Sequence, residues 1–429
     1  MINAASLKKI IADQQDELRE VSRLVSFVPR DISTKKVTDI FSKGPGLVVI
    51  QGVRRCGKST FAFNCFEGKF VYLNFDDERL LGLTAEDLNG MLSASYELYG
   101  PDIECFVLDE IQNIAGWELF VSRLQKTKKL IVTGSNANLL SKELATHLTG
   151  RHYSFTLYPF SFREFLRLKK VELSRNLDGL STKNISIVRA LFSAYLKEGG
   201  FPDVQKYGRL FSQSIYSDVV NKDILQRYHL RAPATFRKFA HYVISNYAHE
   251  INLTKTGKHL GIKDPHTTNK YFGYLEETYL AFGLRRYFHK LKAQLVTNKK
   301  SYAIDPGLLG AVAFTPTASL ASVYENIVFL ELLRRRDYVS SVDEIYFWQG
   351  DRCEVDFVIR NQKSFESAIQ VCFDPSQPQT LEREVKALLS VKRELKAKKL
   401  TIITDSEERI LSESGVKISF IPLWKWLLS

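Results

Sequence analysis

Short apolar runs alternate with amphipathic stretches through the first third of the chain. Four of these runs, over residues 47–50, 69–75, 105–110 and 130–136, are rich in β-branched and aromatic residues. Such runs are typical of strands buried on both faces of a parallel sheet, and the stretches between them predict covering helices. Apolar residues at near-helical spacing predict a further helix over residues 5–24. The pattern therefore predicts an α/β domain with a parallel sheet, preceded by a helical lead-in.

Beyond residue 166 the pattern becomes helical. The helices predicted here span residues 185–196, 212–226 and 236–247. From about residue 306 the order changes to a helix, three strands, a helix and further strands. These elements are predicted over residues 322–333, 344–348, 353–359, 367–372, 381–396 and 400–404. The chain is thus expected to contain a helical middle and a second, smaller α/β domain.

Residues 251–280 have a helix-turn-helix layout, and two strands predicted after it, over residues 284–290 and 300–304, could form a wing. The lysines expected near the tip of this wing are Lys290, Lys292, Lys299 and Lys300. If this winged-helix-like region binds DNA, we expect Thr268 and Lys270 of the second helix to enter a groove and the wing lysines to contact phosphates. The alternative is a winged helix that serves only for packing.

Composition narrows the class of protein. With 429 residues, of which 45% are hydrophobic, the chain is long enough for two or three domains with cores of their own. The chain has no run of 18 apolar residues and its first 20 residues are polar, so we expect no membrane-spanning helix or secretory signal and a cytoplasmic protein. The five cysteines include no C-x-x-C pair, which indicates reduced thiols. A formal charge of +12 favours an anionic partner such as nucleic acid.

Residues 52–59, Gly-Val-Arg-Arg-Cys-Gly-Lys-Ser, fit the pattern G-x-x-x-x-G-K-[ST] between a predicted strand and a predicted helix. Glycines let the backbone turn its N–H groups inward, so the pattern indicates a P-loop that cradles polyphosphate. Lys58 is expected to reach the β- and γ-phosphates, the Ser59 hydroxyl to hold Mg²⁺, and Thr60 to lie near the α-phosphate. The expected nucleotide-binding residues are Gly52, Arg55, Cys56, Gly57, Lys58, Ser59 and Thr60. The alternative is a glycine-rich turn with a surface lysine.

Two carboxylates, Asp109 and Glu110, end the third predicted strand. In an open parallel sheet, ligand groups gather at the carboxyl ends of the strands, so Asp109 is expected beside Ser59, where it can bind Mg²⁺. Glu110 can polarise the attacking water as a general base. This is the pattern of a Walker B element, and the alternative is a strand that ends in solvated acids.

Polar residues after the next strand supply further candidates. Asn136 or Ser135 could sense the γ-phosphate, or could simply belong to a β-turn. Arg151, just before another predicted strand, could stabilise transition-state charge in its own chain or in a neighbouring copy, which leaves a homo-oligomer open. The alternative for Arg151 is an ordinary surface arginine.

These motifs together resemble a prokaryotic family of predicted AAA-type ATPases with an uncharacterised C-terminal domain. The resemblance rests on Gly-Val-Arg-Arg-Cys-Gly-Lys-Ser, Leu-Asp-Glu-Ile-Gln, Thr-Gly-Ser-Asn-Ala, Leu-Thr-Gly-Arg and Leu-Tyr-Pro-Phe-Ser-Phe-Arg-Glu-Phe, and covers nearly the whole chain. It implies ATP binding with Mg²⁺, leads us to expect hydrolysis, and names no substrate.

The last part of the chain resembles the restriction-endonuclease-like core. The metal site of that core takes an acid from the first helix, an Asp from the second strand and an acid-x-lysine pair from the third. Glu325 matches the helix acid and Asp356 the strand Asp, while Gln370 and Cys372 occupy the pair. Gln370 can still offer an oxygen to Mg²⁺, but Cys372 supplies no cation, although Lys386 on the following helix could reach in. We therefore expect a degenerate nuclease site without nuclease activity.

The sequence predicts four segments: a lead-in over residues 1–29, a P-loop ATPase domain over 30–165, a helical and winged-helix-like region over 166–305, and a restriction-endonuclease-like domain over 306–429. The predicted function is MgATP hydrolysis coupled to a conformational change, with DNA as a candidate partner. Two alternatives remain: an ATP-dependent DNA-processing nuclease, and a nucleotide-switched signalling protein that touches no nucleic acid.

Overall fold

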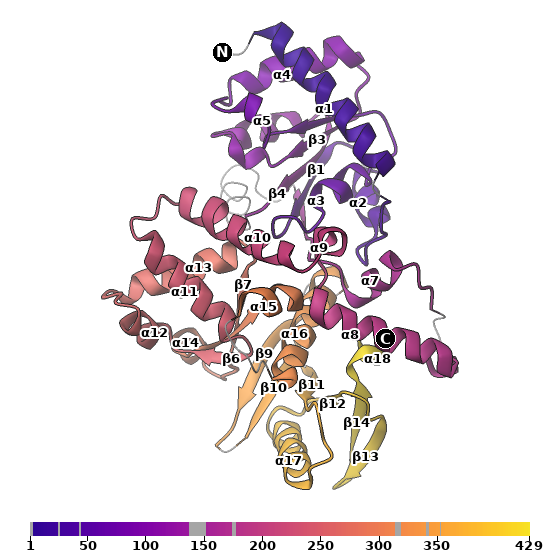
Figure 1. The fold of residues 1–429 in the computed structure, drawn as a ribbon, viewed down its shortest axis with the longest axis vertical. Helices are drawn as coiled ribbons and strands as arrows, with labels where there is room; N and C mark the ends of the chain where they lie inside the picture. The colour runs from indigo at the N-terminus through magenta and orange to yellow at the C-terminus, as the bar shows by residue number, and fades with distance from the viewer. Residues whose placement is uncertain are drawn as a thin grey trace. The chain divides into compact units, whose positions relative to one another are not determined.

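The computed structural model of the chain describes residues 3–24, 26–42, 44–136, 152–173, 177–313, 319–339, 343–351 and 353–429. The chain divides into two compact units, residues 1–158 (unit 1) and residues 159–429 (unit 2) (Figure 1). The boundary predicted near residue 165 lies close to this division. The boundary predicted near residue 305 falls inside unit 2.

In its described residues, unit 1 is built on a five-stranded sheet in the order β2-β3-β4-β1-β5. The strands are β1 (Gly46–Gln51), β2 (Phe70–Asn74), β3 (Cys105–Asp109), β4 (Lys129–Gly134) and β5 (His152–Thr156). Each pair of neighbours runs parallel. The three central strands are buried along most of their length, which explains why their sequences are continuous apolar runs. The predicted α/β fold with a parallel sheet is confirmed.

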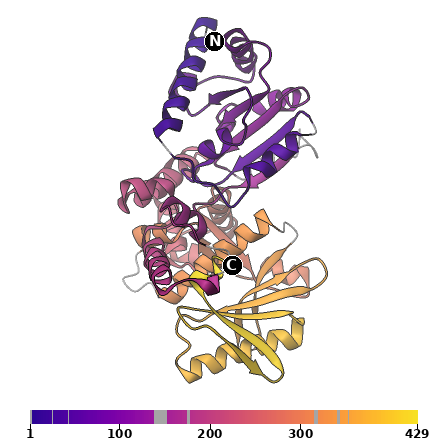
Figure 2. The ribbon, with the colours of Figure 1, turned by 90° about the vertical axis from the view of Figure 1, so that its right-hand side faces the viewer.

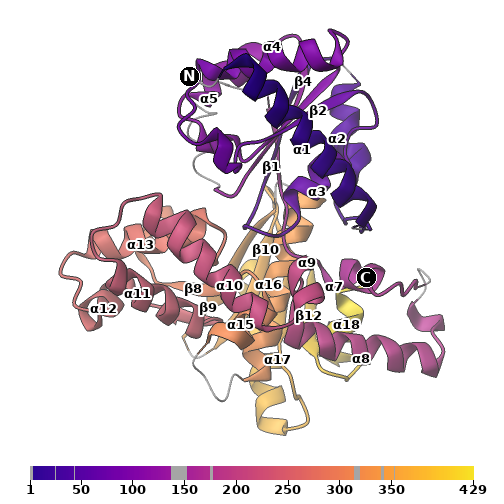
Figure 3. The ribbon, with the colours of Figure 1, turned by 45° about the horizontal axis from the view of Figure 1, so that its top comes forward.

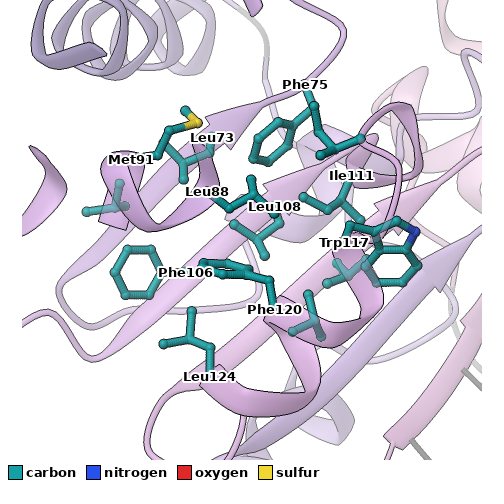
Figure 4. Packing of buried hydrophobic residues seen from close by; sticks show 14 of the residues in the cluster. Leu73, Phe75, Leu88, Met91, Phe106, Leu108, Ile111, Trp117, Phe120 and Leu124 are labelled. Atoms are coloured by element: carbon teal, nitrogen blue, oxygen red, sulfur yellow. The ribbon is translucent and has the colours of Figure 1, made fainter. Parts of the chain in front are cut away.

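Helices cover both faces of this sheet. They are α1 (Ala4–Leu24), α2 (Thr34–Phe41), α3 (Lys58–Phe63), α4 (Asp87–Tyr99) and α5 (Trp117–Leu124), with short 3-10 turns at Glu78–Leu80 and Ile111–Asn113. Figures 1 and 3 show α4 and α5 on one side of the sheet and α2 and α3 on the other. The core on the α4–α5 side contains Leu73, Phe106 and Leu108 of the strands packed with Met91, Trp117 and Phe120 of the helices (Figure 4).

The N-terminal helix α1 belongs to unit 1 and is more than the lead-in that its position suggested. Leu7, Ile10 and Ile11 lie in the same core cluster as the sheet and α4. Gly90 of α4 allows this approach, because a Cβ there would lie 3.2 Å from Leu7 Cδ1. The amide of Gln15 also donates to the Tyr72 carbonyl of β2 at 3.2 Å. Burial of its apolar face therefore makes α1 a structural part of the sheet domain.

Unit 2 begins with helices, as predicted. They are α7 (Phe162–Leu168), α8 (Thr182–Glu198), α9 (Pro202–Tyr207), α10 (Leu210–Asp218), a π-helical continuation at Val219–Gln226, and α11 (Pro233–Ser245), with a 3-10 turn at Leu177–Gly179. A capping box begins α7, since the Ser161 hydroxyl accepts from the Glu164 N–H and the Glu164 carboxylate accepts from the Ser161 N–H.

A small sheet follows, with helices between its strands. The elements in chain order are β6 (His249–Ile251), α12 (Leu253–His259), α13 (Pro265–Glu277), β7 (Ala281–Arg285), α14 (Leu291–Val296) and β8 (Lys299–Ala303). The strands pair antiparallel in the order β6-β8-β7. The helix-turn-helix layout predicted over residues 251–280 is therefore present as α12 and α13.

Three side chains in this region do not lie where the sequence prediction placed them. Thr268, expected on the exposed face of the second helix, is fully buried against Gly257 of α12. Lys300, expected at a wing tip, is also buried. Lys299 is half-buried and pairs with Glu276 at 3.4 Å. Only Lys270 of the predicted groove-facing pair is exposed.

The C-terminal part of unit 2 contains a six-stranded sheet in the order β13-β14-β12-β11-β10-β9. Its elements are α15 (Pro306–Val312), α16 (Leu320–Tyr338), β9 (Glu344–Gln349), β10 (Glu354–Arg360), β11 (Phe365–Val371), α17 (Pro378–Leu395), β12 (Lys399–Thr404), β13 (Arg409–Glu413), β14 (Val416–Pro422) and α18 (Leu423–Trp426). Figure 2 shows the last strands, β13 and β14, in yellow beside the orange strands of the same sheet. The predicted order of helix, three strands, helix and further strands is confirmed.

Candidate functional site

The loop between β1 and α3 has the backbone that the glycine-rich motif predicted. Gly57 has φ 95° and Arg55 has φ 64°, both in the left-handed region, and α3 begins at Lys58. Gly52 has φ 151°, and a Cβ there would lie 2.1 Å from the Leu157 carbonyl oxygen. A side chain at this position would collide with backbone, so only glycine fits. The loop thus turns sharply next to the segment that follows β5.

A buried arginine holds this loop in place. Arg30 Nη1 donates to the Cys56 carbonyl at 3.0 Å, and its Nη2 donates to the Tyr158 carbonyl. The Cys56 thiol donates to the Leu157 carbonyl at 3.2 Å, and burial raises its pKa, so it stays a neutral donor. The carbonyl and the thiol of Cys56 therefore both fix the loop to neighbouring segments. No motif in the sequence marks Arg30.

Lys58 lies buried between the loop and the end of β3. Its Nζ donates to the Val53 carbonyl at 3.1 Å and lies 3.5 Å from Glu110 Oε1. The predicted phosphate-binding lysine and the predicted general base are thus direct neighbours. Ser59 and Thr60 follow Lys58 in the first turn of α3.

Asp109, the last residue of β3, is surrounded by hydroxyl groups. Tyr72 donates to its Oδ2 at 2.5 Å, Thr133 donates to its Oδ1, and Ser59 donates to the same carboxylate. Burial and the charge of Glu110 raise the pKa of Asp109, while these hydrogen bonds oppose the rise. Carboxylate and hydroxyl oxygens side by side are the ligands that Mg²⁺ prefers, so the residues present fit the predicted metal position.

Glu110 has a left-handed backbone, with φ 52°, which is uncommon for a residue other than glycine. Its N–H donates to Thr133 Oγ1 at 3.1 Å, and its Oε2 accepts from Ser135 Oγ at 3.2 Å and from Gln112 Nε2. The carboxylate is therefore oriented from several directions. Backbone strain of this kind is often found at functional sites.

Of the two remaining residues predicted for this site, the structure describes one. Asn136 follows β4 and is fully buried, two residues beyond the strand. Arg151 lies outside the described residues. Sequence reasoning missed Tyr72 and Thr133, although a hydroxyl at the end of an apolar run was a signal available for Thr133.

A glycine-rich loop after β1 and paired acids at the end of β3, which β4 separates from β1 in the parallel sheet, define the P-loop ATPase class. A family model described as "AAA domain" matches residues 45–166. Two further models, described as domains of unknown function (DUF8612 and DUF4143), match residues 189–319 and 321–426.

Relatives match along nearly the whole chain. An uncharacterized protein of Haemophilus influenzae is 30% identical over 401 residues, which cover 88% of this chain and 93% of the relative. The uncharacterized protein MJ1544 of Methanocaldococcus jannaschii is 29% identical over 444 residues, covering 98% of this chain and 96% of the relative. The chain belongs to this prokaryotic family of AAA-type ATPase-like proteins, as the motifs predicted.

Solved structures show more distant likeness. Cdc6p of Pyrobaculum aerophilum has 14% identity and a TM-score of 0.27, covering 71% of this chain and 96% of that chain. The ORC2 protein of Aeropyrum pernix in its ADP form has 10% identity and a TM-score of 0.31, covering 58% of this chain and 85% of that chain.

None of the helices in the described parts of the chain is both long and apolar enough to cross a membrane.

Unit 2 contains a second concentration of charged side chains, at a cavity of about 460 Å³ that Glu325, Glu354 and Asp356 help to line. Lys300 Nζ lies 3.0 Å from Glu325 Oε1, 2.5 Å from Glu354 Oε1 and 3.1 Å from Asp356 Oδ1. We call these four residues the Lys300 cluster. The two acids predicted to converge, Glu325 and Asp356, do so on this ammonium group.

The pKa values in the Lys300 cluster follow from its burial. Burial opposes the charge of Lys300, but the Asp356, Glu325 and Glu354 carboxylates outweigh it and raise the pKa of the lysine. Burial and the charge of Asp356 raise the pKa of Glu325. The lysine is therefore held in its charged form.

The other residues predicted for this site are placed differently. Gln370 Oε1 accepts from the Asp356 N–H at 3.1 Å and its Nε2 donates to Glu384 Oε2 at 2.7 Å, so the amide oxygen is already engaged. Cys372 is buried, and burial raises its pKa to about 11, so it provides no charge. Lys386 is exposed and pairs with Glu382 at 2.5 Å on its own helix, so it does not supply the missing cation. Lys300 and Glu354 were not predicted for this site.

Proposed function

We propose that the chain binds and hydrolyses MgATP at the P-loop of unit 1 and couples its nucleotide state to a conformational change. The observation that carries this proposal is the convergence of Lys58, Asp109 and Glu110, with Lys58 Nζ only 3.5 Å from Glu110 Oε1. A cation for phosphate, a carboxylate for metal and a carboxylate for water are the parts that phosphoryl transfer needs. The match of residues 45–166 to an AAA-domain model supports the same function.

Each residue has a proposed role. Lys58 exchanges its contacts with Val53 and Glu110 for oxygens of the β- and γ-phosphates. Ser59 and Asp109 hold Mg²⁺, which when bound neutralises charge on the phosphates. The N–H groups of the loop from Gly52 to Thr60 line the phosphates.

Glu110 accepts a proton from the attacking water, because departure of Lys58 toward phosphate removes the ammonium group beside its Oε1. The contacts from Ser135 and Gln112 keep that carboxylate oriented. Asn136 is the proposed sensor of the γ-phosphate. Arg151 is proposed to stabilise transition-state charge in this chain or across a homo-oligomer interface.

A nucleotide titration tests the site. Lys58→Ala should weaken MgATP binding by roughly 100-fold, since the variant has no ammonium group to form charge-assisted hydrogen bonds with the phosphates. Isothermal titration calorimetry measures the affinity, and Lys69→Ala is the matched control, because Lys69 lies outside the P-loop and pairs with Asp102 at 2.7 Å. An affinity equal to that of Lys69→Ala would disprove the P-loop assignment.

DNA binding by unit 2 is the second candidate function. The order α11, β6, α12, α13, β7, α14, β8, with the sheet order β6-β8-β7, supports a winged-helix-like region in which α14 lies between the two wing strands. Lys255, Lys258, Lys263 and Lys270 on or beside α12 and α13 are exposed, and in the described ranges no carboxylate lies within salt-bridge distance of them. Exposed unpaired lysines on a basic protein suit phosphate contact.

Fluorescence anisotropy with duplex DNA at several salt concentrations tests this second candidate. Added salt should weaken binding steeply, and replacing Lys255 and Lys258 by alanine should reduce the slope of affinity against salt by roughly one unit for each phosphate that is no longer neutralised. Lys417→Ala, an exposed lysine on β14, is the control. Affinity that is independent of salt, or equal in the two variants, would favour the signalling alternative without nucleic acid.

The C-terminal sheet with α16 and α17 is proposed to be a restriction-endonuclease-like core kept for structure or binding. The engaged amide of Gln370 and the outward position of Lys386 speak against the alternative of an ATP-dependent nuclease.

A further inference from the structure

A restriction-endonuclease-like core implies a divalent metal between the helix acid and the strand Asp, which here are Glu325 and Asp356. The Lys300 cluster shows how well these residues would fit such an ion. The ammonium group of Lys300 has three N–H donors, and three carboxylates lie within 3.1 Å of it. Each donor therefore has its own acceptor, and the position where the acids meet is already filled by a cation.

Further hydrogen bonds engage the same acids. Asp356 Oδ2 accepts from the Val371 N–H at 2.9 Å, and Glu325 Oε1 accepts from the Tyr302 hydroxyl at 2.7 Å. The Gln370 oxygen is bonded to the Asp356 N–H. Among the described residues, no group of three or more His, Cys, Asp or Glu is arranged to hold a metal ion. The residues present do not fit a metal while Lys300 keeps this position.

Lys300 is firmly held in this position. It lies within β8, where it pairs with Glu250 of β6 and Leu284 of β7 in the sheet ladder. At the end of the strand, the Asn326 side chain of α16 exchanges two hydrogen bonds with the backbone of Ala303, at 2.8 and 3.0 Å. Between these points, the Tyr302 ring stacks on Phe329 of α16 at 4.2 Å. The strand that carries the lysine is thus bound to the helix that carries Glu325.

We infer that Lys300 is the resident cation of this site, taking the place that a divalent metal has in the related fold and joining the small sheet to the C-terminal sheet. The intact chain then binds no Mg²⁺ or Mn²⁺ among these acids. A divalent ion would meet the charge of the ammonium group at close range, and it can enter only when the ammonium is removed. This inference extends the proposed structural role of the C-terminal core and is independent of ATP hydrolysis in unit 1.

Mn²⁺ binding to the full-length, nucleotide-free chain tests the inference, with free Mn²⁺ followed by electron paramagnetic resonance. Lys300→Met should bind one Mn²⁺ about tenfold or more tightly than any site of the wild type, since the freed carboxylates are suitable ligands. Adding Asp356→Asn to Lys300→Met should abolish this gain. Lys299→Met is the matched control, because this neighbouring lysine pairs with Glu276 outside the cluster and should behave as wild type.

Two results would overturn the inference. One is a folded Lys300→Met variant, by circular dichroism, that gains no Mn²⁺ site. The other is a Mn²⁺ site in the wild type that Asp356→Asn removes, which would place the metal beside Lys300 and favour the nuclease alternative. If Lys300→Met does not fold, Mn²⁺ binding by the wild type is compared with Mn²⁺ binding by Asp356→Asn. Equal binding by these two chains supports the inference. Because no nucleotide is present, failure of the ATPase proposal would leave all these outcomes unchanged.

Discussion

Both units place a buried lysine against acidic side chains, but the two lysines are held in different ways. Lys58 donates to the Val53 carbonyl at 3.1 Å and lies 3.5 Å from the Glu110 carboxylate, while Lys300 lies between 2.5 and 3.1 Å from the carboxylates of Glu325, Glu354 and Asp356. The residue types are the same, so they do not decide the role. How closely the carboxylates surround the ammonium group decides whether a lysine can leave for a ligand or is part of the structure.

The backbone strengthens this contrast. Lys58 begins a helix after a glycine-rich loop, and its ammonium group lies at the end of a flexible four-carbon side chain that can turn toward phosphate. Lys300 lies in the middle strand of a three-stranded sheet, with ladder partners on both sides. The first site is therefore suited to exchange its contacts, and the second to keep them.

The largest expected effect is on stability. Lys300→Met should destabilise unit 2 by about 3–5 kcal/mol, because removing one partner leaves buried carboxylates without their counter-charge. Lys58→Met should cost less than about 1 kcal/mol, because Glu110 keeps its hydrogen bonds from Ser135 and Gln112. Urea denaturation of the nucleotide-free chain measures both. Equal losses in the two variants would refute the contrast between a structural and an exchangeable lysine.

The next effect is on turnover. Glu110→Gln should lower the rate of ATP hydrolysis by about 10²–10⁴-fold with MgATP affinity unchanged, because an amide cannot take the proton of water. Phosphate release under saturating MgATP measures this rate. Glu104→Gln is the matched control, since Glu104 lies just before the other end of the same strand and pairs with Lys129. Glu325→Gln in the Lys300 cluster should leave turnover unaltered, and a wild-type rate in Glu110→Gln would remove this residue from the mechanism.

A smaller effect on turnover is expected from the hydroxyl group that contacts both Asp109 and Glu110. Thr133→Val removes the hydroxyl that donates to Asp109 and accepts the Glu110 N–H, and should lower turnover about tenfold at limiting Mg²⁺, since hydrogen bonds to charged groups contribute roughly 1.5–3 kcal/mol. The activity measured against Mg²⁺ concentration gives the size of the effect. Thr401→Val on β12 of unit 2 should show no change. A curve for Thr133→Val that overlays the wild type would show that the hydroxyl does not support the metal site.

The smallest effect on turnover is expected from a residue that orients Glu110 and takes no part in the proton transfer. Ser135→Ala removes one hydrogen bond to Glu110 Oε2 and should lower turnover about fivefold, equivalent to roughly 1 kcal/mol, without changing MgATP affinity. Ser364→Ala removes a similar bond to Glu366 in unit 2 and serves as control. If Ser135→Ala turns over as fast as Ser364→Ala, then Ser135 does not orient the general base.

Elements that depend on neighbouring residues could be predicted from the sequence. The strand pattern, the loop at Gly52–Ser59 and the acids at Asp109 and Glu110 are local in the chain, because phosphate binding needs consecutive backbone groups and a strand places its last residues at one edge of the sheet. The convergence of Glu325 and Asp356 was also predicted, from the order of helix and strands. Asn136 and Arg151 stay predictions as sensor and charge-stabilising residue.

Long-range packing determines which residues complete each site. Arg30 binds carbonyls that lie 26 and 128 residues away, so no local pattern identifies it. The two lysines Lys299 and Lys300 are adjacent, and a strand sends alternate side chains to opposite faces. The sequence does not say which face is buried. Acids that lie 25 and 56 residues further on select Lys300, because a buried ammonium group requires carboxylates around it and the fold brings this strand to that position.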